Sequence, residues 1–302
     1  MDIIKDYNEH KDGWKTNIID SSELKLDEKL GSGATGTVFN GTWKDKNVIC
    51  KCSYLKDYDD ILELFEDIDT ELYNYSKLKN TTYCCELYGV SWNEKNKSLI
   101  LVLKNYNVEG DLHDYIDKGE YWNHDLSTVY ISTWENKKWF YNMTKKEKIE
   151  ITISICNAIE ELHERDIVHC DLKTNNLLYC PKEKKAIIID FGASKFMDGE
   201  RYERISRNWG TVGYTCETLN KGICHKKADI YSLSVCILEV WCGNIWNDSK
   251  DHHGTRLEVL RSLRILEKNE KELVKILRKG LHKNMDQRPY IKTFNKKIRS
   301  LF

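Results

Sequence analysis

The sequence predicts an α+β fold in which a small β-rich lobe with one helix precedes a larger, mainly helical lobe. Short β-branched segments bounded by turn residues occupy the chain from Leu24 to Cys52 and indicate strands. One strongly amphipathic segment follows at residues 60–79 and indicates the helix of this lobe. Beyond Gly110 the apolar residues recur at mainly helical intervals. At 302 residues, the chain is long enough for two such lobes.

The individual elements give approximate boundaries for these parts. We expect strands at 24–26, 37–39, 48–50, 87–90 and 99–103, and helices at 60–79, 149–163, 230–241 and 257–281. The chain then divides into an extension at 1–20, an N-lobe at 21–107 and a C-lobe at 108–302. An aromatic-rich insert at about 119–142 has no assigned structure. Its side chains form either a satellite core packed on the helical lobe, which we favour, or an exposed recognition patch.

Composition narrows the class of protein. Hydrophobic residues make up 40% of the chain and charged residues 31%, which excludes a wholly disordered or collagen-like protein. The net charge of -1 provides no global attraction to nucleic acid or an anionic membrane. No apolar run approaches the roughly 18 residues of a membrane span, and the charged N-terminus is unlike a signal peptide. We therefore expect a cytoplasmic protein that neither binds nucleic acid nor spans a membrane.

The eleven cysteines are scattered, without a C-x-x-C pair or a zinc-type Cys/His spacing. An odd number at irregular spacing is typical of buried free thiols in a reducing compartment rather than of a disulfide scaffold. We therefore expect free thiols and no cysteine-bound metal.

The segment Gly31-Ser32-Gly33-Ala34-Thr35-Gly36 lies between two expected strands. Glycines permit a tight turn and a close approach of backbone N–H groups to phosphates. A strand containing Val38 follows, whereas a Rossmann dinucleotide site opens a helix at this point. On this motif alone, a plain glycine-rich hairpin is an equally good interpretation.

Two charged residues follow at regular intervals. Lys51 lies twenty residues after Gly31 on an apolar strand, and Glu71 lies twenty residues further on the amphipathic helix. Taken singly, Lys51 is typical of an edge-strand lysine whose ammonium group extends to solvent. Glu71 taken singly is typical of a solvent-exposed helix face. As a pair across strand and helix, they would hold an ammonium group against phosphate oxygens.

The segment 167–178 is decisive, because it carries His169, Asp171, Lys173 and Asn176 in the order H-x-D-L-K-x-x-N. Asp190-Phe191-Gly192 begins nineteen residues after Asp171. These segments resemble the catalytic loop and the metal-binding loop of eukaryotic-type protein kinases. With the glycine-rich segment, Lys51 and Glu71 in the same order, the resemblance covers about residues 24–300. It implies a bilobal protein kinase fold.

The resemblance assigns catalytic and metal-binding roles. Asp171 would accept or orient the proton of the substrate hydroxyl, and Lys173 would neutralise the γ-phosphate of ATP. Lys51, held by Glu71, would contact the α- and β-phosphates. Asn176 and Asp190 would hold Mg²⁺, a hard cation that prefers oxygen ligands.

It also assigns the nucleotide pocket. The backbone of Gly31–Gly36 would cover the phosphates, Val38 and Leu178 would sandwich the adenine, and Ile49 would lie above it. Family members usually have alanine at the position of Ile49, whose bulk could reshape the pocket. The residue at the back of this pocket is Lys104 by direct counting from Gly110, or Leu103 after a shift by one residue.

Later segments extend the resemblance. Residues 210–214 are similar to the end of an activation segment, Asp229 to the aspartate that braces the catalytic loop, and Arg288 to a late Arg-Pro motif. The amino-acid sequences of several segments are most similar to those of the tyrosine-kinase-like group, whose members mostly phosphorylate Ser and Thr. Lys173, and Thr211 as a hydrogen-bonding partner of the catalytic residues, match that specificity.

Three further positions depart from the family pattern. Cys170 replaces the usual arginine before the catalytic aspartate, so we expect activity without activation-loop phosphorylation. The glutamate that normally pairs with the arginine at 288 is missing, and we expect Glu217 to replace it after a one-residue shift. Ser234 stands where the helix often carries glycine.

Two functions remain in competition. The first is an active protein kinase that uses ATP and Mg²⁺ on Ser and Thr residues of protein substrates. The second is a pseudokinase scaffold or decoy, a class that usually lacks the phosphate-binding lysine, the catalytic aspartate or a metal ligand. Because all of these are present here, we favour the enzyme. The sequence leaves the oligomeric state open.

Overall fold

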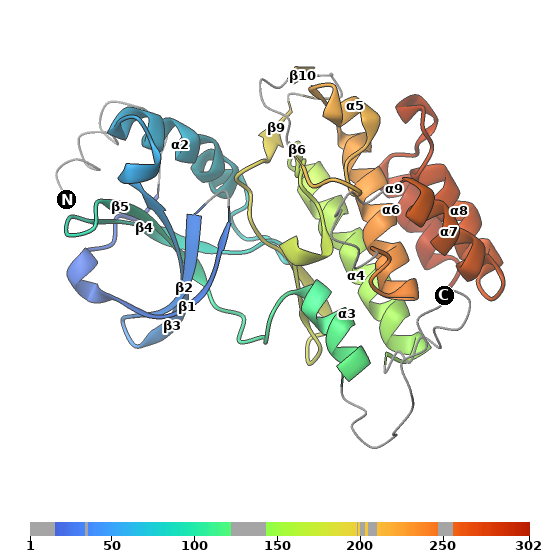
Figure 1. The fold of residues 1–302 in the computed structure, drawn as a ribbon, viewed down its shortest axis with the longest axis horizontal. Coiled ribbons are helices and arrows are strands. Elements are labelled where there is room, and N and C mark those ends of the chain that lie inside the picture. The colour runs from blue at the N-terminus through green and yellow to red at the C-terminus, as the bar shows by residue number, and fades with distance from the viewer. Residues whose placement is uncertain are drawn as a thin grey trace. The chain divides into compact units, whose positions relative to one another are not determined.

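The computed structural model describes residues 16–33, 36–121, 143–197, 199, 203–204, 210–246 and 256–302 (Figure 1). The chain divides into two compact units. The first unit comprises the chain up to Asn107 together with Asp190–Ser194. The second unit comprises Val108–Ile189 and Lys195–Phe302.

The first unit contains a five-stranded antiparallel sheet in the order β1-β2-β3-β5-β4. Its strands are β1 (Leu24–Gly33), β2 (Gly36–Trp43), β3 (Lys46–Tyr54), β4 (Leu87–Asn93) and β5 (Ser98–Lys104). All five predicted strands are confirmed, and each is longer than predicted. One face of β3 and β5 buries Val48, Cys50, Cys52, Ile100 and Val102 in a core cluster.

In the described part of this unit, the α-helix α2 (Ile61–Lys77) confirms the helix predicted at 60–79. Its N-terminus is capped by Asp60, whose carboxylate accepts hydrogen bonds from the N–H groups of Leu62 and Glu63. Its apolar stripe buries Leu64, Phe65, Ile68, Leu72 and Tyr75. The spacing of these residues at three and four positions is the reason why one face of the helix is buried.

The edge of the sheet at β4 is covered by the segment 17–19. The N–H of Ile19 donates a hydrogen bond to the carbonyl oxygen of Val90 (2.7 Å). The N–H of Val90 donates a hydrogen bond to the carbonyl oxygen of Asn17 (2.9 Å). The Ile19 side chain is buried in the core cluster. Gly89 makes this approach possible, since a Cβ there would lie 2.3 Å from the Asn17 carbonyl oxygen. Part of the expected extension therefore belongs to the sheet; residues 1–15 lie outside the described residues.

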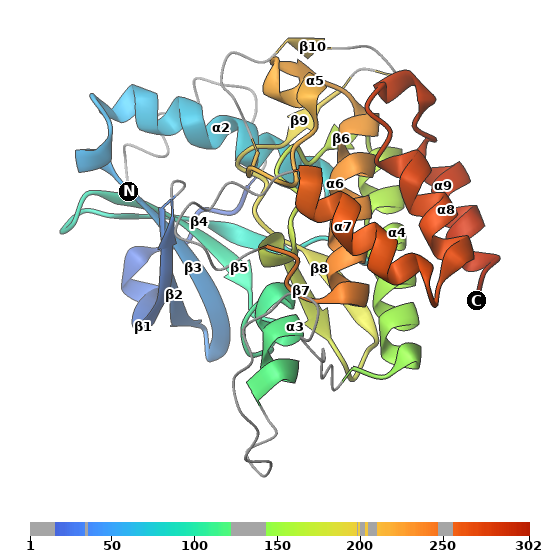
Figure 2. The ribbon, with the colours of Figure 1, turned by 45° about the vertical axis from the view of Figure 1, so that its right-hand side comes forward.

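The second unit is mainly helical (Figure 2). Its helices are α3 (Leu112–Tyr121), α4 (Lys145–Glu164), α5 (Glu217–Asn220), α6 (Lys226–Cys242), α7 (Arg256–Glu267), α8 (Lys271–Gly280) and α9 (Ile291–Arg299). Three short two-stranded pairs accompany them: β6 (Ile167–Val168) with β9 (Lys195–Phe196), β7 (Leu177–Cys180) with β8 (Lys185–Ile188), and β10 (Glu203–Arg204) with β11 (Ile223–Cys224). This composition and the sheet of the first unit agree with the bilobal α+β fold predicted.

Helix α6 is the central element of the second unit. Every residue from Ala228 to Trp241 is buried, and α4, α7 and α8 pack against it (Figure 2). A helix that is apolar on nearly all sides requires such a location. The predicted helices at 149–163 and 230–241 are confirmed within α4 and α6. In the described part of the chain, no helix is both long and apolar enough to cross a membrane.

The prediction of continuous helix at 257–281 is wrong, because the helix stops after Glu267 and restarts at Lys271. Glu270 leaves the helical region with φ -131° and ψ 56°. Each half has its own apolar stripe, and the break lets both α7 and α8 pack on α6. No glycine or proline marks the break, so the sequence carried no local signal for it.

The expectation that Glu217 replaces the missing partner of Arg288 is also wrong. Glu217 begins α5 and forms ion pairs with Lys221 (2.8 Å) and Lys283 (3.6 Å). The buried Arg288 guanidinium instead donates to the carbonyl oxygens of His282 (2.8 Å), Lys227 (3.1 Å) and Lys283 (3.5 Å). Backbone carbonyls therefore satisfy the arginine without a carboxylate.

The aromatic-rich insert cannot be compared with its prediction. Helix α3 continues to Tyr121, and residues 122–142 lie outside the described residues.

The close contact at Gly89 gives a stability prediction. We expect Gly89→Ala to displace the segment 17–19 and to lower the free energy of unfolding by about 1–3 kcal/mol, because the new methyl group meets a backbone carbonyl. Gly33→Ala is the matched control, since a Cβ at Gly33 meets no atom within 4 Å. Urea unfolding measures both variants. Equal losses in the two variants would contradict the proposed contact.

Candidate active site

A three-residue ionic cluster forms in the first unit. The Lys51 Nζ atom lies 3.0 Å and 2.9 Å from the two carboxylate oxygens of Glu71, and 2.8 Å from Oδ1 of Asp190. The predicted pairing of Lys51 with Glu71 is therefore present. Lys51 and Glu71 are buried, whereas the Asp190 side chain retains 30% exposure.

The carboxyl groups of this cluster keep the Lys51 side chain positively charged. Burial alone lowers the pKa of Lys51, but Glu71 and Asp190 outweigh it and raise the pKa above its ordinary value. Lys51 is therefore an ammonium at neutral pH. Of the two carboxyl groups around this ammonium, burial raises the pKa of Glu71, and Asp190 is the more exposed.

Helix α2 holds the segment that carries Asp190. The ring of Phe191 packs edge-on against Tyr75, with 5.2 Å between ring centroids, and the Asn74 amide donates to the Ser194 carbonyl oxygen (3.0 Å). Asp190 itself has φ 61°, a left-handed conformation that aspartate tolerates better than most residues. The helix that supplies Glu71 thus also fixes the backbone around Asp190.

The register of the sheet orders the expected pocket residues. Val38 lies opposite Lys51, and Ile49 lies opposite Leu103. Directly opposed residues share a sheet face, and residues two apart on a strand share it as well. Val38, Ile49, Lys51 and Leu103 therefore share one face of the sheet.

The same register decides between Leu103 and Lys104. Lys104 lies opposite Val48, on the other face, and its Nζ is 3.5 Å from the Glu86 carboxylate. Leu103 is therefore the residue beside Ile49. Leu178, the other expected adenine contact, is half-buried on β7 of the second unit.

The glycine-rich segment forms the hairpin between β1 and β2. Gly33 pairs with Gly36, and the two residues between them, Ala34 and Thr35, lie outside the described residues. Gly36 has φ 127°, and a Cβ there would lie 2.5 Å from the Cys52 carbonyl oxygen. At Gly31 and Gly33 a Cβ would meet no atom within 4 Å. Glycine is thus required by the fold at position 36, whereas Gly31 and Gly33 leave the backbone open to a ligand.

The second unit places the catalytic-loop residues around Asp171. The Thr211 hydroxyl donates to Asp171 Oδ1 (2.8 Å) and accepts a hydrogen bond from Lys173 Nζ (2.9 Å). Lys173 Nζ also lies 3.1 Å from Asp171 Oδ2. The Asn176 amide nitrogen donates to the backbone oxygen (2.8 Å) and Oδ2 (3.2 Å) of Asp171. The contacts expected for Thr211 are confirmed, and the Asp171 carboxylate is fixed from several sides.

Asp229 braces this loop from the first turn of α6. Its carboxylate accepts hydrogen bonds from the N–H groups of His169 (2.8 Å) and Cys170 (3.1 Å), and it lies 2.9 Å from Nε2 of His163. The predicted bracing role is confirmed. The buried charge of Asp229 is satisfied because it receives donors from backbone and side chain together.

The sequence analysis missed a second buried acid, Glu239. Its Oε2 atom accepts hydrogen bonds from Tyr214 (2.6 Å) and from the catalytic-loop residue Thr174 (3.1 Å). Burial raises the pKa of Glu239 to about 8. The signal was available, because a glutamate inside an otherwise apolar, buried helix needs polar partners.

The departures from the family pattern have structural consequences. Cys170 is buried, with its Sγ atom 3.3 Å from that of Cys224, so its side chain is not available to a phosphorylated segment. The extra side chain of Ser234 fits because Gly280 faces it, and a Cβ at Gly280 would lie 2.0 Å from the Ser234 oxygen. Tyr202 and Ser206, two hydroxyl-bearing residues that precede the segment 210–214, lie outside the described residues.

The donor atoms suit Mg²⁺ better than a transition metal. Asp190 offers carboxylate oxygens, and Asn176 offers an amide oxygen whose nitrogen is directed to Asp171. Within the described ranges, no group of three or more His, Cys, Asp or Glu side chains forms a ready metal site.

Comparison with known proteins agrees with this geometry. The chain is 28% identical over 298 residues to the probable serine/threonine-protein kinase gdt2 of Dictyostelium discoideum, covering 95% of this chain and 16% of the relative. It is 30% identical over 229 residues to the stress-activated protein kinase alpha of the same organism, covering 75% of this chain and 31% of the relative. A putative L-type lectin-domain containing receptor kinase V.8 of Arabidopsis thaliana is 26% identical over 241 residues, covering 78% of this chain and 34% of the relative.

These matches span about a third or less of each relative's length. A family model described as the protein kinase domain matches residues 24–297, which is most of the chain. The ionic cluster around Lys51 and the loop around Asp171 lie within that range. The chain therefore belongs to the protein kinase family.

Proposed function

We propose that this protein transfers the γ-phosphate of ATP to serine and threonine hydroxyls of protein substrates. The observation that carries the proposal is the arrangement of Thr211, Lys173 and Asn176 around the Asp171 carboxylate. The ammonium of Lys51, held by two carboxylates in the first unit, supports it independently.

The residues around Asp171 would act by position and charge. Asp171 orients the acceptor hydroxyl and takes its proton, since its Oδ1 and Oδ2 atoms are held in place by neutral and cationic donors. Lys173 lies beside this carboxylate and stabilises negative charge on the transferred phosphoryl group.

The residues of the first unit would position the nucleotide. Lys51 binds its phosphates, and the open backbone at Gly31 and Gly33 covers them. Asn176 and Asp190 would hold Mg²⁺, which neutralises phosphate charge when it is bound. Val38, Ile49 and Leu103 line the sheet face that would receive the adenine.

Specificity for serine and threonine is supported by two observations. Thr211 bridges Asp171 and Lys173, the arrangement that the resemblance associates with Ser/Thr kinases. Several relatives, including gdt2, carry names that describe them as probable serine/threonine-protein kinases. We also propose that the chain is closest to the tyrosine-kinase-like group.

The competing function is a scaffold without catalysis. Its one supporting feature is Ile49, whose side chain lies on the same sheet face as Lys51 and reduces the space for an adenine ring. ATP with Mg²⁺ raises the melting temperature if the nucleotide binds. No shift and no phosphate transfer would favour the scaffold.

The charged residues of the first unit give the first catalytic prediction. We expect Asp190→Asn and Lys51→Met each to lower phosphate transfer by about a hundredfold or more, because they remove metal-binding and phosphate-binding groups. Lys51→Met also lowers the melting temperature, since the buried Glu71 loses its ammonium partner.

Lys104→Met is the matched control, because Lys104 lies on the opposite face of the same sheet. It should retain near-normal transfer. Radiolabelled phosphate transfer and thermal denaturation provide the two measurements. Near-normal turnover of Asp190→Asn with Mg²⁺ would show that the metal site is assigned wrongly.

The hydroxyl of Thr211 gives the second prediction. Thr211→Val keeps the side-chain shape but removes the bridge between Asp171 and Lys173, so we expect at least a tenfold loss of turnover. Thr211→Ser keeps the hydroxyl and should retain most of the activity. Phosphoamino-acid analysis of substrates should give phosphoserine and phosphothreonine. Phosphotyrosine alone would overturn the proposed specificity.

The burial of Cys170 gives the third prediction. An arginine at this position would pair with a phosphate, whereas the buried thiol of Cys170 offers no such charge. Phosphatase-treated protein should therefore keep most of its activity, and Ser206→Ala should change turnover less than about threefold. A tenfold drop, about 1.4 kcal/mol in barrier height, would mean that another basic group performs this role.

A further inference from the structure

Two cysteine thiols meet directly beside the catalytic aspartate. The Sγ atoms of Cys170 and Cys224 lie 3.3 Å apart, although the residues are 54 positions apart in the sequence. Cys170 is 2% exposed and Cys224 is fully buried. All eleven cysteines are free thiols, so this contact is a pair of reduced side chains rather than a disulfide.

The start of α6 holds both members of this pair. Cys224 ends β11, and His225 follows it as the N-cap of α6. Asp229, in the first turn of the same helix, accepts the hydrogen bond from the Cys170 N–H (3.1 Å). Cys170 has φ 66°, so a left-handed backbone turns its side chain at this point. The two thiols are therefore kept in contact by the same scaffold that braces the catalytic loop.

We propose that Cys170 and Cys224 form a reversible disulfide when the protein meets a peroxide, and that this bond switches off phosphoryl transfer. The inhibitory part rests on the proposed kinase function, whereas formation of the bond does not. In a reducing compartment, disulfides that form between close thiols are usually transient and redox-sensing.

The oxidation proceeds in two balanced steps. The Cys224 thiol releases its proton, its sulfur attacks one oxygen of hydrogen peroxide, and the O–O bond breaks. A sulfenic acid forms, and the departing hydroxide takes up the released proton as water. The Cys170 sulfur then displaces the hydroxyl group, which leaves with the thiol proton as a second water molecule. Two thiols are oxidised to one disulfide, and one peroxide is reduced to two water molecules. A dithiol reductant reverses the reaction by thiol–disulfide exchange.

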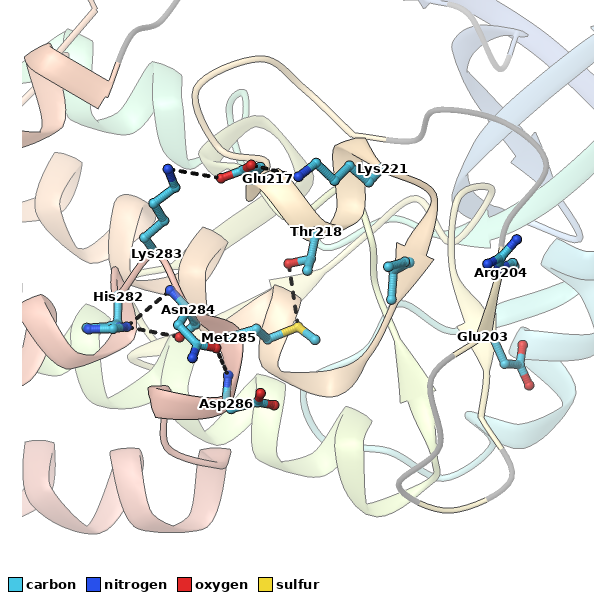
Figure 3. A pocket seen from close by; sticks show the side chains of 11 residues that line it. Glu203, Arg204, Glu217, Thr218, Lys221, His282, Lys283, Asn284, Met285 and Asp286 are labelled. Atoms are coloured by element: carbon cyan, nitrogen blue, oxygen red, sulfur yellow. Dashed lines mark hydrogen bonds and ion pairs between the residues drawn. The ribbon is translucent and has the colours of Figure 1, made fainter.

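A cavity lies beside β11, and Figure 3 shows the side chains that line it. It has a volume of about 800 Å³ and is lined by Ile223, the neighbour of Cys224, and by Glu203 and Arg204 of β10. In the described part of the chain, β11 pairs with β10 at Glu203 with Cys224 and at Arg204 with Ile223. Both residues of β10 are exposed. Cys224 does not line the cavity, so a small uncharged peroxide would reach its sulfur from there when β11 separates from β10.

Cys224 is the first target in this sequence of steps because it adjoins Ile223, which lines the cavity. The hydrogen bond with Cys224 and burial raise the pKa of the Cys170 thiol well above the usual range, which disfavours its thiolate. Cys170 lies in contact with Cys224 and resolves the sulfenic acid once that has formed.

The disulfide would displace the catalytic aspartate. A disulfide bond is about 2.05 Å long, so the sulfur atoms must approach by about 1.2 Å from their present contact. Cys170 is the residue directly before Asp171, whose carboxylate is aligned by Thr211 and Lys173. A displacement of about 1 Å at a reacting group commonly costs about a hundredfold in rate.

The test treats the full chain with hydrogen peroxide and measures two quantities. Mass spectrometry after differential alkylation should identify a Cys170–Cys224 linked peptide. Phosphate transfer should fall at least tenfold with the same time course and recover after dithiothreitol. Cys224→Ser should keep basal activity, because Cys224 is outside the catalytic machinery, and should resist peroxide.

Cys242→Ser is the matched control. Cys242 is the one cysteine of the eleven that is not buried, so it is the first target if exposure alone decides. This variant should remain sensitive to peroxide. If Cys224→Ser does not fold, Cys224→Ala takes its place, and the peptide analysis of the unaltered chain requires no variant.

The outcomes separate the proposal from the proposed function. Absence of the linked peptide while other cysteines are oxidised would overturn the disulfide. A linked peptide with unchanged activity, or equal inhibition of Cys224→Ser, would overturn the switch. If the untreated chain transfers no phosphate, the kinase proposal fails together with the inhibitory part, whereas the linked peptide still decides whether the bond forms.

Discussion

The contact of the Lys51 ammonium with the carboxylates of Glu71 and Asp190 is the constraint on which the first unit depends. A buried ammonium needs charged partners, and each partner comes from a different segment. Strand β3 supplies Lys51, helix α2 supplies Glu71, and the segment 190–194 supplies Asp190. The packing of Tyr75 on Phe191 aligns the helix with that segment. The contact therefore depends on the position of Lys51 in the sheet, on the position of α2 and on the left-handed backbone at Asp190.

The second unit also contains buried ionisable side chains that need partners, in this case two acids. Asp229 and Glu239 lie on the almost entirely buried helix α6, where each is stable only because donors from other segments reach it. Those donors belong to the catalytic loop and, in the case of Tyr214, to the segment after Thr211. Because these two buried acids need hydrogen-bond donors from the loop, their hydrogen bonds fix the backbone near Asp171. The same arrangement holds the Cys170 sulfur against that of Cys224, which is the contact on which the proposed redox switch rests.

Local features were predictable because they depend on neighbours in the sequence. Alternating and helical apolar patterns predicted the strands and α2 for that reason. The pairing of Lys51 with Glu71 and the contacts of Thr211 join residues distant in the sequence. The order of the motifs predicted the first, and the resemblance to protein kinases predicted the second. Features that depend on packing were not predictable. The break at 268–270, the carbonyl partners of Arg288 and the position of the segment 17–19 arise from distant elements. The choice of Leu103 over Lys104 needed the strand register, which counting residues does not give.

The central claim is that Asp171 activates the acceptor hydroxyl while other residues bind the nucleotide. Asp171→Asn tests it most directly, in a single-turnover measurement of γ-phosphate transfer to a serine-containing protein, with thermal shifts by ATP and Mg²⁺ measured in parallel. The account predicts that the unaltered chain and Asp171→Asn show equal thermal shifts, and that the variant transfers phosphate about a hundredfold more slowly or less. Equal transfer rates for the two proteins would contradict the account.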